Sequence, residues 1–564
     1  MLDVEHFVQE RYPQLLLQRP LLAKPLLIAL RLLFHEKEIR QFGANYPHLK
    51  GFDFVEQALD YFDFSYRLRD RERHRIPSRG RIVIAANHPI GSLDGLALLQ
   101  LVREIRPDVK VIANDLLTAI EPLANLLLPV DNMSGNTPRQ NLRALGEFLE
   151  SEGALIIFPA GEVSRFGAKG IRDGRWRTGF LRVAASARAP ILPVFIDGRN
   201  STFFYALSFL ARPLSTLWLV REMFKQAKRC VDVRIGEPIS HRCYQDIQLP
   251  KHAKAKLFRR HLYRIGSDRP GLFPVETAIA RPEHRRQLRD EIRSCRQIGA
   301  TADGKQIHLY HHRADSAVMR EIGRLRELAF RAVEEGSGQR RDLDHFDPHY
   351  EHLLLWDEQE WEIAGAYRIC PAGTGRPLYS STLFEFTTGM NPYLAQGLEL
   401  GRSFVQPGYW GKRSLDYLWH GIGAYLRDHP QYRYLFGPVS LSSAYPREAL
   451  ELIVHFYERH FPAWQPLATP RNPFTIGPQR RAELDARYPG DSYREEFQRL
   501  KHELGERKLS IPTLYKQYAE LCDIRGVQFT AFNVDPAFGN CVDGLVIVDL
   551  ARLKKSRRER YLAE

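Results

Sequence analysis

The segment Ile82–Gly95, "IVIAANHPIGSLDG", places His88 directly after an apolar run and Asp94 six residues further on. Histidine is the side chain whose pKa suits removal of a proton from a hydroxyl near neutral pH. A carboxylate that contacts the far ring nitrogen fixes the tautomer and stabilises the imidazolium. The segment therefore indicates a pair that activates a hydroxyl, or else an ordinary strand-to-helix turn in which Asp94 caps the helix.

A second block, Ala154–Arg165 ("ALIIFPAGEVSR"), is also an apolar run that ends in a polar turn. Gly161 in this turn allows backbone N–H groups to approach a ligand closely, and Arg165 can pair with an anion. A third apolar run follows at Ala189–Ser201. We expect Gly161, Glu162 and Arg165 to bind substrate.

Both blocks lie in a first half that alternates apolar runs with helical patterns. Continuous apolar strands separated by amphipathic helices are typical of an α/β layer fold with a largely buried sheet. Sites in such folds form at the carboxyl ends of the strands, where these residues stand. We expect strands at 81–86, 109–113, 154–158 and 191–197, and helices at 95–106, 138–151 and 176–187.

In this order and spacing, the three blocks resemble the glycerolipid acyltransferases of the lysophosphatidic-acid-acyltransferase type, over about residues 82–200. Members of that family carry Asn-His-x4-Asp, then Phe-Pro-Glu-Gly-Thr-Arg-Ser, then a Val-Pro-Val-like strand. The resemblance implies transfer of an acyl group from a thioester to a hydroxyl, with His88 as general base and Asp94 orienting it. It also makes Asn87 and the Gly161 loop candidates for binding the acceptor.

Two departures from the family pattern bear on the acceptor. Five residues rather than four separate His88 from Asp94, and Gly91 could absorb the extra residue. Ala160 stands in place of the glutamate of the second motif, and Val163 stands in place of its arginine. Because that motif handles glycerol phosphate in the family, its alteration favours an acceptor lipid without phosphate.

A change of composition divides the sequence into two domains. Gly and Pro accumulate over 266–282 and a charged stretch follows at 283–296, so we interpret 281–300 as a connection between domains at 1–280 and 301–564. In the second domain we expect strands at 305–312 and 362–370, a strand at 381–389 that returns as a hairpin, and a helix at 412–426. The second domain is therefore also expected to be α/β.

The second domain contains three polar patterns in sequence order. Asp-x-Asp-x-x-Asp stands at Asp342–Asp347, Gly-x-x-Arg ends at Arg368, and Glu-x-x-Arg spans Glu399–Arg402. Composition alone would describe these as a solvated loop and a surface ion pair. Their order resembles that of two GNAT-like groups, the acyl-homoserine-lactone synthases and the amino-acid N-acyltransferases of ornithine lipid synthesis. The resemblance covers about 321–439, and 511–550 resembles the terminal part of the N-acyltransferases.

By that resemblance the site candidates of the second domain are Asp344, Asp347, Arg368, Glu399 and Arg402. An amine must be deprotonated before it attacks a thioester, and Glu399 could accept the proton directly or through water. The carboxylate of an amino acid suits bidentate pairing with Arg368 or Arg402. The loop 405–413 precedes a helix, whose N-terminus could receive the pantetheine phosphate of the donor.

The bulk composition narrows the choice of partner and compartment. The 564-residue chain has a formal net charge of +14, which favours an anionic membrane or an acidic protein partner. No nucleic-acid motif is present, so nucleic acid is not expected to bind. The 6 cysteines have neither paired nor metal-like spacing, which indicates a reduced compartment and neither a disulfide framework nor a metal site.

The amino-terminal region offers no pattern for secretion or for crossing a membrane. The start lacks the basic and apolar parts of a signal peptide. Leu15–Phe34 is apolar but interrupted by charges and prolines, whereas a span needs about 20 apolar residues. This segment either lies in the membrane interface or packs as a helical hairpin against the core. We expect a peripheral protein on the cytoplasmic face of the inner membrane.

Two acyltransferase-like domains, one for hydroxyls and one for amines, have a simple joint product, and the chain resembles the bifunctional ornithine lipid synthases in domain order. The resemblance implies N-acylation of an amino acid, with ornithine favoured, by a 3-hydroxyacyl thioester and then O-acylation of the 3-hydroxyl. Acyl carrier protein, an acidic partner, or coenzyme A would present the acyl groups, with no resident cofactor. The alternatives are a phospholipid (1-acylglycerol-3-phosphate) acyltransferase with a degenerate second domain, and a non-catalytic membrane-surface protein.

Overall fold

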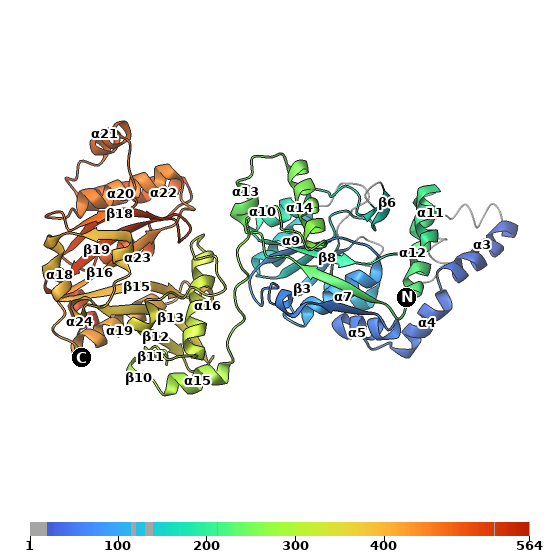
Figure 1. The fold of residues 1–564 in the computed structure, drawn as a ribbon, viewed down its shortest axis with the longest axis horizontal. Coiled ribbons are helices and arrows are strands. Elements are labelled where there is room, and N and C mark those ends of the chain that lie inside the picture. Colours follow the sequence, from blue (N-terminus) through green and yellow to red (C-terminus); the bar gives the residue numbers. More distant parts are fainter. Residues whose placement is uncertain are drawn as a thin grey trace. The chain divides into compact units, whose positions relative to one another are not determined.

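The computed structural model describes residues 20–113, 120–129, 139–167, 170–210, 212–523 and 525–562. The chain divides into two compact units, residues 1–278 and 279–564. Each unit is built on its own mixed α/β layers, drawn from blue to green and from green to red in Figure 1. The expected α/β class is therefore confirmed for both halves.

The first unit contains a seven-stranded sheet in the order β1-β9-β8-β2-β5-β3-β4. All neighbouring strands are parallel except β8 and β9. The strands are β1 (Ser65–Leu68), β2 (Ile82–Ala86), β3 (Val109–Ala113), β4 (Leu127–Pro129), β5 (Ala154–Ile157), β8 (Ile191–Asp197) and β9 (Cys230–Ile235). A small antiparallel pair, β6 (Arg165–Gly167) and β7 (Gly170–Arg172), stands apart from the sheet.

Strand β2 is the centre of this sheet and every one of its residues is buried. Its side chains alternate between two apolar clusters, with Ile82 and Ile84 in one and Val83 and Ala85 in the other. A strand covered on both faces must be apolar throughout, which explains the continuous run in the sequence. Its carboxyl end therefore leads directly into the turn that carries His88.

Helices cover both faces of the first sheet (Figure 1). One face packs against α5 (Gly51–Tyr61) and α7 (Ser92–Arg103). The other face packs against α9 (Arg139–Glu150), α10 (Gly179–Ser186) and α14 (Lys251–Ile265). The remaining helices of this unit are α3 (Pro20–Leu33), α4 (Glu36–Asn45), α6 (Asp70–Arg73), η1 (Glu121–Leu126), α11 (Thr202–Leu210), α12 (Arg212–Lys225) and α13 (His241–Gln245).

The apolar amino-terminal segment is described only from Pro20 onward, so 15–19 of the expected interfacial segment lies outside the described residues. Helix α3 packs against α12, where Phe34 and Val220 share a small apolar cluster. On its other side Ile28 and Leu32 are exposed. Among the described residues, no helix combines the length and apolar character needed to span a bilayer.

The second unit contains an eight-stranded sheet in the order β10-β11-β12-β13-β15-β16-β19-β18. All neighbours are antiparallel except β15 and β16. The strands are β10 (Arg296–Ala300), β11 (Gln306–His311), β12 (Glu351–Asp357), β13 (Glu362–Pro371), β15 (Gly397–Val405), β16 (Tyr434–Leu441), β18 (Val527–Asp535) and β19 (Cys541–Asp549).

Helices also cover both faces of this sheet. Successive side chains of β12 accordingly pack into two different apolar clusters, one on each face. Helix α16 (Ala317–Arg331) packs on one face, and α19 (Ser414–Asp428) and α20 (Arg447–His460) pack on the other. The remaining α-helices among the described residues are α15 (Arg285–Arg293), α17 (Ser380–Leu383), α18 (Asn391–Ala395), α21 (Pro478–Arg487), α22 (Tyr493–Glu506), α23 (Thr513–Ala519) and α24 (Lys555–Tyr561).

Two segments contain elements that differ from those expected. The hairpin expected at 381–389 is wrong, because α17 occupies its start and β14 (Phe384–Phe386) pairs with β17 (Ala468–Pro470) instead. Strand β13 has no free edge for such a hairpin, since β12 and β15 flank it. The segment 281–300, expected as a connection, contains α15 and the edge strand β10.

Candidate active sites

The turn after β2 is built around the buried carboxylate of Asp94, the third residue of α7. One oxygen, Oδ2, accepts hydrogen bonds from the backbone N–H groups of Ile90 and Gly91, at 2.9 and 3.3 Å. These contacts satisfy donors at the start of the helix, where a negative charge is favourable. Asp94 therefore caps α7, which was one of the two interpretations of the sequence.

The second oxygen of the same carboxylate contacts His88, as expected for a pair that activates a hydroxyl. Asp94 Oδ1 lies 3.0 Å from His88 Nδ1, and the His88 side chain is 21% exposed. Gly91 adopts a φ of 124°, which a residue with a side chain rarely adopts, and this lets the turn accommodate five residues. The capping interaction and the histidine contact therefore use different oxygens of one rigidly held carboxylate.

The surroundings of His88 favour its protonated form. Burial opposes protonation, but the carboxylates of Asp94 and Asp173 outweigh burial, so the pKa of His88 is raised above its ordinary value. The Phe158 ring, at the end of β5, lies 4.3 Å from the imidazole centroid and limits its movement. The imidazole is thus a stronger base than a free histidine, and it is held in one place.

Sequence reasoning missed Asp173, which lies 85 residues from His88 along the chain. Its Oδ1 accepts hydrogen bonds from the His88 N–H at 3.2 Å and from the Ser164 hydroxyl at 2.6 Å. Its Oδ2 accepts from Trp176 Nε1 at 2.8 Å. No pattern in the sequence marks this residue, because the contact forms only when three separate loops meet.

The other candidates of the first unit have partners within the protein. The side-chain amide of Asn87 bonds both the N–H and the carbonyl of Ile196, so it joins the ends of β2 and β8. Arg165 pairs with Glu162 at 3.0 Å and also donates to the hydroxyls of Ser208 and Ser215 in α11 and α12.

The loop after β5 turns at Gly161, which has a φ of 67°. A Cβ there would lie 3.6 Å from the guanidinium carbon of Arg177, so the backbone passes close to that side chain. The neighbouring N–H of Ser164 donates to the His88 carbonyl at 2.7 Å. The structure thus joins the Gly161 loop to the turn of His88, while the role of this loop in acceptor binding stays a prediction.

In the second unit Glu399 is buried and both of its oxygens are engaged. Oε1 accepts from the backbone N–H of Ser380 at 2.7 Å, and Oε2 accepts from the Tyr350 hydroxyl. That hydroxyl in turn accepts from the N–H of Tyr379 at 2.8 Å. Burial and the neighbouring Glu399 raise the pKa of Tyr350, so the phenol remains the donor.

A bulge in β15 brings Glu399 and Arg402 to the same side of the sheet. Residues three apart on a regular strand face opposite sides. Between the pairs Ala366–Phe404 and Arg368–Gly401, however, β15 contains one residue more than β13. Arg402 lies in this bulge with a φ of 47°, a strained conformation for arginine and one found near functional sites.

The aspartates of the 342–347 loop pair with three arginines from three elements. Arg402 contacts Asp342 at 3.2 Å and Asp344 at 3.7 Å. Arg368 contacts Asp344 at 2.6 Å and Asp347 at 3.2 Å. The Tyr379 ring lies beside the guanidinium groups of Arg368 and Arg402, at 5.1 and 4.5 Å. The five predicted site residues of the second domain therefore lie close together.

Arg326, on α16, is a further member of this cluster that the sequence analysis missed. Its Nη1 donates to Asp347 at 2.8 Å and its Nη2 lies 3.3 Å from His352 Nδ1. Burial would raise the pKa of Asp347, but Arg326 and Arg368 hold it well below its ordinary value. Burial and the same arginines lower the pKa of His352 to about 3, so this histidine is neutral.

A second acidic group lies beside Arg402 and was also missed. It consists of Glu335, Asp535 and Asp543, from the loop after α16 and from β18 and β19. Tyr379 donates to Asp535 at 3.3 Å. Burial and mutual repulsion, against the attraction of Arg402, raise the pKa of Asp543 to about 7 and that of Glu335 to about 8. These carboxylates would be stabilised by a further positive charge.

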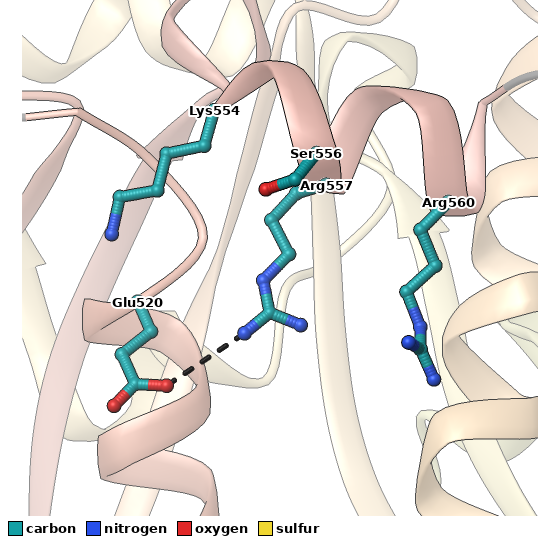
Figure 2. A pocket seen from close by; sticks show the side chains of 5 residues that line it. All are labelled: Glu520, Lys554, Ser556, Arg557 and Arg560. Carbon is teal, nitrogen blue, oxygen red and sulfur yellow. Dashed lines mark ion pairs between the residues drawn. The ribbon is translucent and has the colours of Figure 1, made fainter.

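A separate surface pocket lies at the carboxy-terminal helix α24. Figure 2 shows Lys554, Arg557 and Arg560 projecting from this region, with Arg557 paired to Glu520 at 3.7 Å. This pocket shares no residue with the Glu399 cluster. Within the described ranges, no group of three or more His, Cys, Asp or Glu side chains is arranged to hold a metal ion.

Comparisons with known proteins agree with this arrangement. A family profile described as Acyltransferase matches residues 7–264, and one described as Acetyltransferase (GNAT) domain matches 325–420. A glycine N(alpha)-acyltransferase of Bacteroides thetaiotaomicron is 32% identical over 50% of this chain and 89% of the relative. A lyso-glycine lipid O-acyltransferase of the same organism is 30% identical over 44% of this chain and 92% of the relative.

An L-ornithine N(alpha)-acyltransferase of Rhodobacter capsulatus is 28% identical over 44% of this chain and 92% of the relative. The two folds, their sites and these matches define an acyltransferase enzyme. The chain belongs to the families of the glycine N(alpha)-acyltransferase and the lyso-glycine lipid O-acyltransferase, and its Acyltransferase match at 7–264 precedes its GNAT match at 325–420.

Proposed function

We propose that the chain makes a phosphorus-free aminolipid in two steps. The second unit joins a 3-hydroxyacyl group to the α-amine of an amino acid, and the first unit then esterifies the 3-hydroxyl with a second acyl chain. One observation carries this proposal. Relatives named for N-acylation of an amino acid and for O-acylation of the resulting lyso-lipid are separate proteins, and each matches half or less of this single chain.

In the O-acylation step, His88 removes the proton from the 3-hydroxyl as the oxygen attacks the thioester carbonyl. The carbon–sulfur bond breaks, and the imidazolium returns the proton to the departing thiolate. Asp94, held 3.0 Å from His88 Nδ1, stabilises the imidazolium between these events. The guanidinium of Arg165 is engaged by Glu162 and two serines. This supports an acceptor without phosphate.

In the N-acylation step, Glu399 accepts the proton of the amine, directly or through water, and the amine nitrogen attacks the thioester carbon. The thiolate leaves and takes up the proton. Arg368 is the better candidate for the amino-acid carboxylate, since its Nε and Nη2 are buried without a hydrogen-bond partner in the described part of the chain. A substrate carboxylate would satisfy both donors. Arg402 would orient Asp342 and Asp344 beside it.

The acyl donor has two candidate contacts in the second unit. Pairing between β15 and β16 ends at Glu399 and Phe436, although both strands continue, so backbone groups beside Glu399 can bond the amides of a pantetheine arm. The loop 405–413 leads into α19, whose N-terminus favours the pantetheine phosphate. The basic side chains at α24 (Figure 2) and the net charge of +14 suit an acidic donor such as acyl carrier protein.

The amino acid is proposed to be ornithine. Glu335, Asp535 and Asp543 form an acidic group beside Arg402, which already contacts Asp342 and Asp344, and a second substrate ammonium would stabilise the ionised form of this group. Glycine, named in the relatives from Bacteroides thetaiotaomicron, has no such group. The purified chain, given a 3-hydroxyacyl carrier protein, should acylate ornithine with a kcat/KM at least about tenfold above that for glycine. A preference for glycine would contradict the ornithine assignment, and no amide with any amino acid would contradict the function.

The first unit is proposed to lie on the cytoplasmic face of the inner membrane. Phe209 and Leu210, at the end of α11, are 90% and 83% exposed. Helix α11 follows the carboxyl end of β8, beside that of β2, and Asn200 bonds the carbonyls of Pro89 and Ile90. The apolar end of α11 therefore stands at the same sheet edge as the His88 turn, where a lyso-lipid must arrive.

Replacing Phe209 and Leu210 together by aspartate is expected to weaken binding to phosphatidylglycerol–phosphatidylcholine vesicles by more than about tenfold. Each large apolar side chain inserted in lipid contributes about 1.5–3 kcal/mol. Vesicle co-sedimentation of the full chain measures this, with Leu249→Asp, at a 46% exposed residue before α14, as the control. Equal binding by the double variant and the control would overturn the assignment of this surface.

A further inference from the structure

A closed ring of hydrogen bonds holds the backbone of His88 on both sides. The His88 N–H donates to Asp173 Oδ1 at 3.2 Å, and the His88 carbonyl accepts from the Ser164 N–H at 2.7 Å. The Ser164 hydroxyl closes the ring by donating to the same Asp173 oxygen at 2.6 Å. The position of the histidine therefore depends on the carboxylate of Asp173.

Helix α14, which packs on the face of the sheet opposite to α7, also holds Asp173. The Asp173 backbone N–H donates to the Tyr263 hydroxyl at 2.7 Å, and its carbonyl accepts from Arg259. Its side chain is 2% exposed. All of its side-chain partners donate to it, namely the His88 N–H, the Ser164 hydroxyl and Trp176 Nε1. Burial raises the pKa of Asp173, whereas these three donors stabilise its ionised form.

We propose that Asp173 is a positioning residue for the O-acyl transfer, because it fixes the backbone of His88 and places a second negative charge beside the imidazole. This inference rests on the proposed role of His88 as general base. Asp94 holds Nδ1 of the ring, whereas Asp173 holds the main chain that carries the ring. The two carboxylates therefore act on the same histidine by different routes.

The charge of Asp173 makes the proposal testable through pH. The groups that face the His88 turn are Asp94 on α7, Phe158 after β5, and Tyr263 with Arg259 on α14. Arg172 lies over the Tyr263 ring at 4.8 Å. Of these neighbours, Asp94 and Asp173 raise the pKa of His88. Loss of the Asp173 charge lowers that pKa, so the acid limb of the rate profile moves to lower pH.

Asp173→Asn keeps the size of the side chain but removes its charge. Because an amide has one acceptor end, it leaves either the His88 side or Trp176 Nε1 without an acceptor. The double variant Asp173→Asn/Trp176→Phe removes the indole donor, so the amide oxygen can turn to His88 and Ser164. Asp246→Asn is the matched control, since Asp246 is exposed and contacts Arg242 at 3.6 Å on the surface.

The experiment follows esterification of a synthetic N-(3-hydroxyacyl)ornithine by the purified full chain between pH 5 and 9. Asp173→Asn should lose about 10- to 100-fold in kcat with little change in acceptor KM, and the double variant, which keeps an acceptor for His88, should lose less. Their acid limb should move to lower pH, N-acylation by the second unit should equal that of the wild type, and a wild-type thermal unfolding profile would show that the first unit is folded. An unmoved acid limb, or a rate equal to that of Asp246→Asn, would overturn the proposal.

A second readout needs no turnover. The pH dependence of carbethoxylation of His88, quantified by peptide mass spectrometry, reports the protonation of the imidazole directly. Its midpoint should fall in both Asp173 variants and stay constant in Asp246→Asn. Absence of esterification by the wild type, together with a shifted midpoint, would contradict the proposed function but uphold the role of Asp173. An unchanged midpoint would contradict the role of Asp173 whatever the activity.

Discussion

Replacing His88 by alanine is expected to stop attachment of the second acyl chain while leaving the first intact. The variant lacks the imidazole that takes the proton of the 3-hydroxyl, and general-base catalysis contributes about 10²- to 10⁴-fold to rate. The single-chain amide should therefore accumulate. Mass spectrometry of lipids from cells that express the variant measures the ratio of the two species, which should change by at least about 100-fold.

The control for this prediction is His252→Ala, which removes an exposed histidine from α14. It should leave the ratio of the two lipids unchanged. Loss of both lipids in His88→Ala, in a protein present at wild-type level, would show that the first unit acts before the second. The order of the two reactions would then be the reverse of the one proposed.

Replacing Glu399 by glutamine is expected to remove both lipids. The amide keeps the shape of the side chain and can still accept from the Ser380 N–H, but it cannot take the proton of an amine. N-acylation of ornithine by the purified chain should fall by about 10²- to 10⁴-fold. Because the single-chain amide is the substrate of the second reaction, the two-chain product should also be lost.

Supplying the missing intermediate separates the two units. Given synthetic N-(3-hydroxyacyl)ornithine, the Glu399→Gln protein should esterify it at the wild-type rate, because His88 is untouched. Glu385→Gln is the matched control, since Glu385 is exposed on β14 of the same unit. Wild-type N-acylation by Glu399→Gln would mean that Glu399 only holds Tyr350 and Ser380 in place.

The sequence predicts best what depends on burial and local chemistry. Strands β3 and β8 begin and end at the predicted residues, because most of their side chains are apolar and buried in the sheet. The contact of His88 with Asp94 also follows from the sequence, since one turn separates them. The turn could not be assigned to capping or to catalysis in advance, because the two oxygens of Asp94 serve both purposes.

Contacts between distant segments could not be predicted in the same way. Asp173 reaches His88 only because β6 and β7 fold back over the turn, and Arg326 reaches Asp347 from helix α16, which packs on a face of the eight-stranded sheet. The spacing of Glu399 and Arg402 even argues against a shared face in a regular strand. The bulge in β15 brings both side chains to the same face of the sheet, and such a bulge cannot be recognised in a single sequence.

The central claim is that one chain attaches both acyl groups of an aminolipid. The most direct test extracts lipids from cells that make no such lipid and express this chain, and analyses them by mass spectrometry with mild alkaline hydrolysis. The account predicts a phosphorus-free aminolipid with one amide-linked and one ester-linked chain, of which hydrolysis releases only the second. An unchanged aminolipid fraction, with a rise in diacylated glycerol phosphate instead, would contradict it.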